Sequence, residues 1–231
     1  MSDTIKKLFN DISPTYDKLN HLLSFNVDKR WRKKTVKTIK ASPDTPLVAL
    51  DLCAGTLDLT LTFLESFPKA RVHALDFSQN MLEVGKKKIP PQFQNQVSLH
   101  CADALKMPFP DDFFDLVFCG YGFRNLDDKQ KGLFEINRVL KKGGEVLILD
   151  FFKPANIFSK LFHTTYGQFL LPLVGGVISG NRQAYQYLND SVKGFLTTNE
   201  LKELFKKQNI RSEDSIHYFM GISSLVVGVK S

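Results

Sequence analysis

The sequence predicts an α/β fold in which a mostly parallel sheet is covered by helices on both faces. Between residues 47 and 152, short apolar runs of strand length alternate with longer segments of helical periodicity. The apolar runs are nearly continuous, as is typical of strands buried on both faces of a parallel sheet. The 231 residues are enough for one large domain and require no second one.

Residues 1–45 are predicted to form an N-terminal helical lid. Helices are expected over 4–12, from the N-cap Ser13 with Pro14 in the first position, and over 28–40 with Asp28 as the cap. The segment 41–46 contains two prolines, so we expect it to be the loop that ends the helical part.

Residues 46–153 are predicted to form the core of the domain. Strands are expected at 47–52, 71–77, 96–102, 114–122 and 145–152. Helices are expected at 57–67, at 78–89 with Ser78 as the N-cap, and at 128–140, and the KKGG segment 141–144 is expected to be a turn. Strands that alternate with helices in this way pair in parallel.

The C-terminal part is predicted to contain an insertion and a final unit. Residues 154–196 read as a long apolar helical stretch followed by a second helical segment. A helix opened by a capping box between Thr197 and Glu200 follows, and the runs 210–219 and 221–230 can pair as an antiparallel hairpin. The hairpin would complete a seven-stranded, mostly parallel sheet.

Composition and charge limit the classes of function. No apolar run reaches the roughly 18 residues of a membrane span, and the N-terminus lacks a secretory signal, so we expect a cytoplasmic protein that starts near Met1. The cysteines Cys53, Cys101 and Cys119 form no CxxC or Cys/His cluster, which predicts reduced, buried residues and no metal site. The formal charge of +7 comes from lysines scattered along the chain, which favours a solvated surface over a dedicated partner.

Polar or small residues lie at the ends of four predicted strands, which meet at one edge of a parallel sheet. They are Asp51, Gly55 and Thr56 at the end of the first strand, Asp76 at the end of the second, Asp103 and Ala104 at the end of the third, and Gly120 at the end of the fourth. Asp76 is placed to accept hydrogen bonds from the two hydroxyls of a ribose, and Asp103 from an adenine amino group. The amides at Gly55 and Thr56 can approach a ligand carboxylate at a helix start.

These residues together describe a site for an adenosine that carries a charged amino-acid tail. The G-x-G-x-x-G spacing that a dinucleotide requires is absent. Each aspartate alone could be a cap or turn residue, but three aspartates at successive strand ends make that interpretation less attractive.

Longer motifs carry a resemblance to a known family. Residues 9–36 are similar to a signature of YD-x-x-N followed by S-x-x-x-x-x-x-WR, and residues 120–128 to F-G-x-R-N. Residues 138–154 are similar to R-V-L-K-P-G-G ending in E-F-x-K-P, and residues 184–195 to A-Y-x-Y-L-x-x-S-I. From about residue 9 to 229, the chain resembles the ubiquinone/menaquinone biosynthesis C-methyltransferases (UbiE/MenG type, demethylmenaquinone methyltransferase-like).

The resemblance implies a class I S-adenosylmethionine-dependent methyltransferase fold, which is Rossmann-like, with S-adenosyl-L-methionine as the cofactor. It implies methylation of a ring carbon of a prenylated quinol, either demethylmenaquinol or a ubiquinol precursor. The family's cofactor contacts fall on Thr56, Asp76, Asp103 and Ala104, and on Gly120 where the family usually has serine. Tyr16, in the YD motif, would be a lid residue over the cofactor or else a packed aromatic.

The first loop departs from the family pattern. It reads DLCAGTLD over residues 51–58, where the family reads D-L-A-G-G-T-G-D. We expect Leu57 to lie in the first helical turn, where leucine is favourable, and to leave cofactor affinity unaffected. If φ at this position is positive, leucine costs of order one kcal/mol relative to glycine. Asp150 also replaces the usual glutamate.

Arg124 is the candidate catalytic residue. Its cation could stabilise a developing phenolate or polarise a water that removes the proton. Alternatively, Arg124 is structural and pairs with Asp127 or Asp128 in its loop. The apolar run 169–178 would line a channel for the prenyl tail on the substrate side, or else pack the core of a lid. With the positive charge, it would let the protein sit reversibly at the inner face of the membrane.

Other functions stay open at this point. A catalytically degenerate member that acts in assembly or interaction, and a methyltransferase for another small molecule, both fit the fold. Nucleic acid is not expected as a partner, because the N/D-P-P-Y/F motif that clamps a flipped base is absent after the fourth strand. A homodimer is compatible with the sequence.

Overall fold

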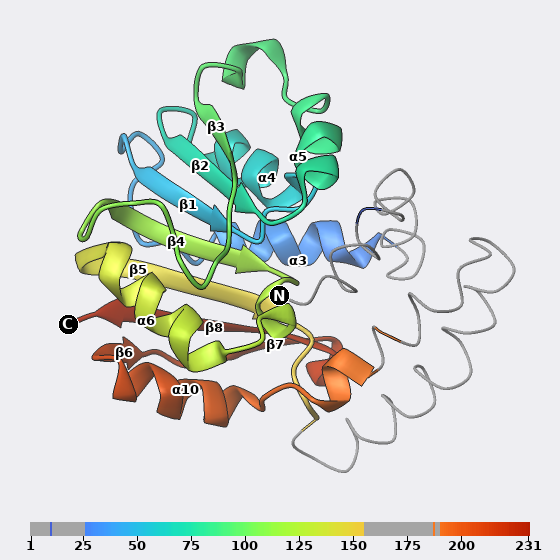
Figure 1. Ribbon diagram of the computed structural model, residues 1–231, viewed down its shortest axis with the longest axis vertical. Helices are drawn as coiled ribbons and strands as arrows, with labels where there is room; N and C mark the ends of the chain where they lie inside the picture. The colour runs from blue at the N-terminus through green and yellow to red at the C-terminus, as the bar shows by residue number, and fades with distance from the viewer. Residues whose placement is uncertain (1–9, 11–25, 155–186, 188–189) are drawn as a thin grey trace, which may run out of the picture.

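The computed structural model describes residues 10, 26–154, 187 and 190–231 (Figure 1). Within these residues, eight strands form one sheet in the order β3-β2-β1-β4-β5-β8-β6, and β7 also pairs with β8. The strands are β1 (Val48–Leu52), β2 (Arg71–Asp76), β3 (Val97–Cys101), β4 (Phe114–Gly120), β5 (Leu140–Asp150), β6 (Ile210–Ser212), β7 (Ile216–Tyr218) and β8 (Ser223–Lys230).

The sheet is parallel from β3 to β5 and antiparallel beyond β5. β6 pairs with residues 228–230 of β8, and β7 pairs with residues 223–225. The two short strands therefore occupy one outer position in succession, so the eight strands fill seven places. The predicted seven-stranded, mostly parallel sheet with a C-terminal antiparallel hairpin is confirmed, with one arm of the hairpin broken in two.

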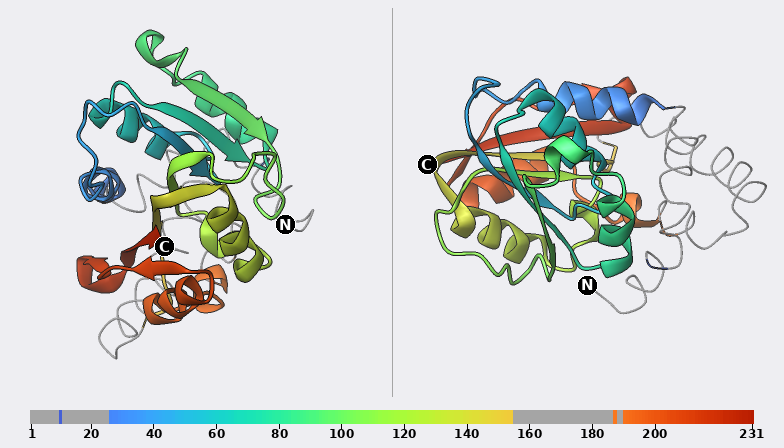
Figure 2. Two further views of the ribbon diagram at one scale, coloured as in Figure 1. Left: turned by 90° about the vertical axis from the view of Figure 1, so that its left-hand side faces the viewer. Right: turned by 90° about the horizontal axis from the view of Figure 1, so that it is seen from above.

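Helices cover both faces of the sheet (Figure 2). One face carries α3 (Val27–Val36), α4 (Asp58–Ser66) and α5 (Gln79–Lys86), and the other carries α6 (Lys129–Val139) and α10 (Thr198–Lys207). Side chains alternate accordingly, because Ala49 packs in the cluster of α3 and α4 whereas Leu50 and Leu52 pack in the cluster of α6 and α10. Short 3-10 turns lie at η1 (Pro91–Phe93), η2 (Phe123–Asn125) and η4 (Phe219–Gly221).

The predicted helix caps are confirmed at two of three described positions. Ser78 accepts a hydrogen bond from the backbone of Met81, and Thr197 forms its capping box with Glu200. The prediction for Asp28 is wrong: α3 begins after Asn26, and Asp28 lies buried in its first turn. Its carboxylate accepts a hydrogen bond from Arg32 one turn later, so Asp28 forms an ion pair within the helix and does not cap it.

The predicted turn at 141–144 is also wrong, because these residues lie inside β5. Gly143 has φ +77, and the pairing of β4 with β5 shifts register between Phe114 and Leu116. A left-handed glycine is typical of such an irregularity, which bends the strand without ending it.

Most of the predicted lid and insertion lies outside the described residues. Within the lid, Asn10 is described, and its side-chain oxygen accepts a hydrogen bond of 2.6 Å from the Ser78 hydroxyl at the start of α5. The N-terminal segment therefore reaches the carboxyl end of β2 at this residue. Among the described residues, no helix is long and apolar enough to cross a membrane.

Leu57 lies just before α4 in the left-handed conformation, with φ 67. The expectation that it belongs to the first helical turn is therefore wrong. Its side chain is fully buried with Ala74 and Leu82, and a Cβ atom on Gly85 would come within 2.5 Å of the Leu57 Cγ atom. The leucine thus fills the space that Gly85 leaves open on α5.

Replacing Leu57 by glycine or alanine separates its backbone strain from its packing. Both variants lose the buried side chain, so each should lower the free energy of unfolding, with Leu57→Ala losing about 2–5 kcal/mol. Because the left-handed backbone favours glycine, Leu57→Gly should be about 1 kcal/mol more stable than Leu57→Ala. Chemical denaturation of both variants measures the difference.

Alanine and glycine at residue 82 provide the control, because Leu82 belongs to the same cluster but lies within α5. There the order should reverse, with the alanine variant more stable by about 1 kcal/mol. The same order at both positions would contradict the left-handed conformation of Leu57.

Candidate active site

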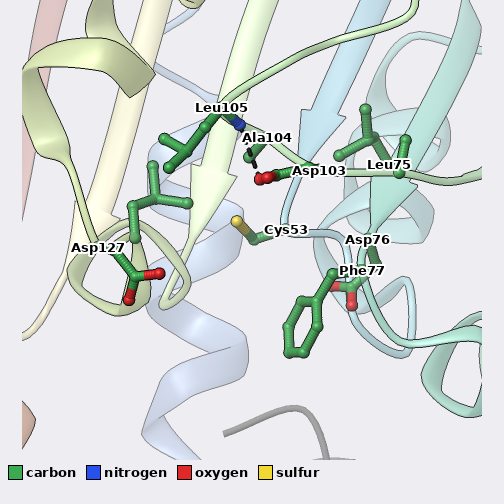
Figure 3. A pocket seen from close by; sticks show the side chains of 10 residues that line it. Cys53, Leu75, Asp76, Phe77, Asp103, Ala104, Leu105 and Asp127 are labelled. Carbon is green, nitrogen blue, oxygen red and sulfur yellow. Dashed lines mark hydrogen bonds between the residues drawn. The ribbon is translucent and has the colours of Figure 1, made fainter. Parts of the chain in front are cut away.

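A pocket opens at the carboxyl ends of the parallel strands (Figure 3). It is lined by Cys53, Leu75, Asp76, Phe77, Ala102, Asp103, Ala104, Leu105, Leu126 and Asp127. These residues come from the loops after β1, β2 and β3 and from the segment after η2. Three of them are aspartates, so the pocket favours a ligand that carries positive charge.

Asp76 joins the loop after β1 to the loop after β2. Its side chain is almost fully buried, and its two oxygens accept hydrogen bonds from the backbone N–H of Gly55 at 2.8 Å and of Ser78 at 2.9 Å. The Gly55 amide was expected to face a ligand carboxylate, but it donates its hydrogen bond to Asp76 instead. Each carboxylate oxygen has a second lone pair, so Asp76 can still accept a ligand hydroxyl. Burial raises the pKa of Asp76 to about 6.

Asp51 supports this arrangement from inside the fold and does not line the pocket. It is buried, and it accepts a hydrogen bond of 2.6 Å from the Thr60 hydroxyl in α4. Burial raises the pKa of Asp51 to about 7, against the lowering effect of the Thr60 bond, and the nearby charge of Asp76 raises it further. The carboxylate thus anchors the start of α4 to β1.

The remaining predicted cofactor residues differ in their placement. Asp103 is exposed on the pocket wall, where it accepts a hydrogen bond of 2.9 Å from the Leu105 amide, and Ala104 is buried beside it. Thr56 is buried in the first loop. Gly120 ends β4 against α4, where a Cβ atom would lie 2.9 Å from the Leu59 side chain. Tyr16 lies outside the described residues.

Arg32 is a buried residue that links α3 to the first loop. Its guanidinium pairs with Asp28 at 2.6 Å and with Asp58 at 3.1 Å, and Asp58 also pairs with Lys88. The guanidinium carbon lies 5.9 Å from the centroid of the Tyr121 ring. The sequence contained a signal for this contact, because Arg32 is the arginine of the WR motif, but the motif alone gave it no partner.

Arg124 is buried in an ion pair with Asp150. Its Nη1 atom lies 2.7 Å from one Asp150 oxygen, and its backbone N–H donates to the other at 3.0 Å. The same Nη1 atom donates to the Tyr121 carbonyl. The two aspartates that the sequence suggested as partners of Arg124 have other roles, because Asp128 caps α6 and Asp127 lines the pocket. The predicted alternative of a structural ion pair is therefore present, with Asp150 as the partner.

Two of the family-like motifs meet at this ion pair. The Arg124 Nε atom donates to the Ser191 hydroxyl at 3.3 Å, and the Tyr187 hydroxyl donates to the Asn125 side chain at 2.8 Å. Residues 126 and 127, which follow directly, line the pocket. Sequence reasoning assigned no role to Asp150, Asn125, Tyr187 or Ser191, although all four belong to the motifs that carried the resemblance.

The cysteines differ from the expectation that they are buried and isolated. Cys101 is exposed and Cys53 is half-buried on the pocket wall, with its backbone at φ 57. Cys119 is fully buried in the neighbouring strand, where burial and a hydrogen bond with Cys53 raise its pKa. Among the residues that the structure describes, no group of three or more His, Cys, Asp or Glu could hold a metal ion.

Solved structures with similar folds include methyltransferases. A S-adenosylmethionine-dependent methyltransferase from Aquifex aeolicus superposes with a TM-score of 0.66 at 17% identity, covering 93% of this chain and 98% of that chain. A "possible histamine N-methyltransferase" from Thermotoga maritima gives a TM-score of 0.67 at 17% identity, covering 97% of this chain and 99% of that chain. At these identities the similarity shows the fold alone, and it confirms the predicted class I methyltransferase fold.

Sequence comparisons are more specific. The demethylmenaquinone methyltransferase of Thermus thermophilus is 39% identical over 221 residues, covering 96% of this chain and 99% of that protein. The ubiquinone/menaquinone biosynthesis C-methyltransferase UbiE of Geobacter sulfurreducens is 36% identical over 230 residues, covering 99% and 89%. A family model described as the ubiE/COQ5 methyltransferase family matches residues 1–230. The chain therefore belongs to the ubiE/COQ5 methyltransferase family.

Proposed function

We propose that this methyltransferase uses S-adenosylmethionine to methylate a ring carbon of a prenylated quinol. Demethylmenaquinol is the first candidate substrate, because relatives in Thermus and Desulfitobacterium are named demethylmenaquinone methyltransferase. A ubiquinol precursor is the second, from the name of the Geobacter relative. The observation that carries the proposal is the placement of the buried Arg124–Asp150 pair beside a pocket lined by Asp76 and Asp103.

The donors on the pocket walls fit the proposed cofactor. When bound, S-adenosylmethionine supplies an electrophilic methyl group on a positively charged sulfur. Asp76 would accept hydrogen bonds from the ribose hydroxyls with its remaining lone pairs, and Asp103 would accept one from the adenine amino group. Thr56 and Tyr16 are proposed as further contacts, on the resemblance of their motifs. Asp51, Gly55 and Gly120 would act indirectly, by holding the loops that carry these contacts.

Arg124 is proposed to act on the substrate side of the pocket. A ring hydroxyl has a pKa near 10, so only modest help is needed for it to ionise, and a fixed cation nearby stabilises the phenolate. Asp150 accepts one hydrogen bond from the guanidinium and one from the Arg124 backbone N–H, and the Ser191 hydroxyl accepts one from Nε. Such fixed geometry lowers the cost of reorganisation during the reaction.

The alternative of a degenerate, non-catalytic member depended on the altered first loop. Leu57 turns its side chain toward Gly85 in α5 and is not among the residues that line the pocket. Of the three residues in this loop that depart from the family pattern, Cys53 lines the pocket whereas Ala54 and Leu57 do not, and this limited change favours an active enzyme.

The prenyl tail of the substrate also supports the proposal that the protein works at the inner face of the cytoplasmic membrane.

A methyl-transfer assay tests the proposed function. Reduced demethylmenaquinone and a demethylated ubiquinol precursor are offered side by side with labelled S-adenosylmethionine, and the products are identified by mass spectrometry. We expect transfer to a ring carbon of at least one quinol. Transfer to neither would refute the substrate assignment, and calorimetric titration would then show whether the cofactor still binds.

Cofactor affinity should increase as the pH rises through the pKa of Asp76. The pKa of Asp76 is raised to about 6, and only its ionised form attracts a cation or accepts two hydroxyl hydrogens. The dissociation constant for S-adenosylmethionine should therefore fall by about tenfold between pH 5 and pH 7. Asp76→Asn should bind more weakly at pH 7 and lose most of this pH dependence.

Asp103→Asn is the matched control, because it removes a carboxylate from the exposed part of the same pocket. It should weaken binding but keep the increase between pH 5 and pH 7. If Asp76→Asn kept the wild-type pH dependence, another group would be responsible.

Substitution of Arg124 should affect the chemical step more than cofactor binding. Arg124→Lys keeps the charge but loses the guanidinium geometry, so kcat should fall roughly 10–100-fold while cofactor affinity stays within about twofold. Asp150→Glu keeps a carboxylate and should retain most of the activity. Asp150→Asn leaves a buried cation unpaired and should lower the free energy of unfolding by about 3–5 kcal/mol.

Arg32→Lys is the control for a buried arginine away from the substrate side. Arg32 is also paired with aspartates, so this variant should lose stability in thermal denaturation. Equal losses of kcat in the two arginine variants, measured on folded protein at saturating cofactor, would argue against a specific role for Arg124.

A further inference from the structure

Much of the net charge of the protein lies in one segment, α3 and the four residues that follow it. Residues 27–40 carry seven cations and one acid, a formal charge of +6, whereas the whole chain carries +7. The outward side of α3 presents a set of exposed cations that we name the α3 basic face: Lys29, Arg30, Lys33, Lys34 and Lys37. The cations of this segment were expected to be part of a charge scattered along the chain, whereas in the structure five of them lie on one side of α3 and its C-terminal end.

Ion pairs within the described fold do not account for the α3 basic face. Its members recur at intervals of three and four residues, so like charges lie next to one another and weaken the helix. None of the five forms an ion pair with another described residue. On α10, by contrast, the exposed Lys206 and Lys207 share the helix with the exposed Glu200 and Glu203. A mixture of both signs is usual for a solvated helix, so the uniform charge of α3 points to an anionic partner.

Exposed apolar side chains border the α3 basic face. Phe219 is 59% exposed in the turn after β7, and Ile216 is 39% exposed within that strand. Between them, Tyr218 stacks on Trp31 of α3 with ring centroids 6.2 Å apart. The Lys34 ammonium lies 5.9 Å from the centroid of the Tyr218 ring. Cations and apolar side chains are therefore adjacent on one side of the molecule.

This side of the molecule adjoins the carboxyl edge of the sheet, where the pocket opens. Arg32, in the second turn of α3, pairs with Asp58 at the start of α4. The turn that contains Phe219 leads into β8, whose second residue, Ser224, pairs with Asp150 at the carboxyl end of β5. The N-terminal part of the α3 basic face and Phe219 thus flank the same edge as the pocket, and the helix runs from there toward the amino end of β5.

We propose that the α3 basic face, together with Phe219 and Ile216, docks the protein on an anionic lipid bilayer with the pocket edge turned toward it. The proposal rests on the proposed function, because a prenylated quinol dissolves in the bilayer and must be taken from it. Cations that contact acidic headgroups and apolar side chains that enter the interface are what such docking requires. An RNA partner would use the same cations, and the experiment below separates the two.

Vesicle co-sedimentation of the full chain tests the docking surface. The vesicles contain phosphatidylglycerol and phosphatidylcholine in equal parts, or phosphatidylcholine alone. The test variant combines Lys29→Gln, Arg30→Gln, Lys33→Gln and Lys37→Gln, and the matched control removes the same charge elsewhere with Lys86→Gln, Lys87→Gln, Lys206→Gln and Lys207→Gln. All eight residues are exposed, and glutamine preserves helix propensity.

Each cation near an anionic surface strengthens binding about fivefold, so the α3 variant should lose at least tenfold in partitioning onto the anionic vesicles. The control should lose less than threefold. Salt screens the cations, so the vesicle binding that persists at high salt reports the apolar contacts. Phe219→Asn should reduce this binding severalfold, and asparagine tolerates the left-handed backbone that Phe219 has at φ 45. Equal losses in the α3 variant and the control would overturn the proposal. So would a filter-binding assay with RNA in which the α3 variant loses RNA binding while its vesicle binding stays intact.

Activity measurements separate this proposal from the proposed function. The α3 variant should methylate a water-soluble, short-tailed quinol at the wild-type rate and a vesicle-embedded, long-tailed quinol at least tenfold more slowly. A wild-type protein that methylates quinols but does not bind anionic vesicles would refute the docking surface alone. One that binds vesicles through α3 but methylates no quinol would refute the proposed function alone.

Discussion

The buried carboxylate of Asp76 is the interaction on which the site depends. It accepts one backbone hydrogen from the loop after β1 and one from the loop after β2, so it sets the distance between the starts of α4 and α5. A buried carboxylate is costly unless it is hydrogen-bonded, and these two bonds supply that compensation. Asp51 on the adjacent strand binds Thr60 in α4 in the same way. The first loop therefore keeps its shape with Gly55 but with alanine at 54 and leucine at 57, where the family pattern has glycine.

Two buried arginines connect the outer elements to this centre. Arg32 joins α3 to the start of α4 through two aspartates, and Arg124 joins the segment after β4 to the end of β5 and to Ser191. Each guanidinium is charged at any physiological pH, so neither connection is released by titration of the arginine. Removing Asp150 would leave the charge of Arg124 unbalanced in a low-dielectric environment, and removing Asp28 and Asp58 would do the same for Arg32. Both connections are therefore sensitive to substitution.

The alternation of strands and helices could be predicted from the sequence, because apolar periodicity determines it directly. The backbone conformation of Leu57 could not, since a non-glycine residue at positive φ depends on the packing against Gly85, which is 28 positions away in the chain. The partner of Arg124 was missed for a similar reason, because only the register of β4 with β5 brings Asp150 to it. The contact between Cys53 and Cys119 likewise requires the pairing of β1 with β4.

The fit of Leu57 against Gly85 also restricts the order in which such a loop can have changed. A side chain at 85 would meet Leu57 Cγ at 2.5 Å and the Thr56 backbone at 2.9 Å, so a leucine cannot enter at 57 while any other residue occupies 85. We expect the glycine in α5 to have preceded the leucine. Among related sequences, leucine at this loop position should therefore occur only together with glycine at the matching helix position, whereas that glycine can occur alone.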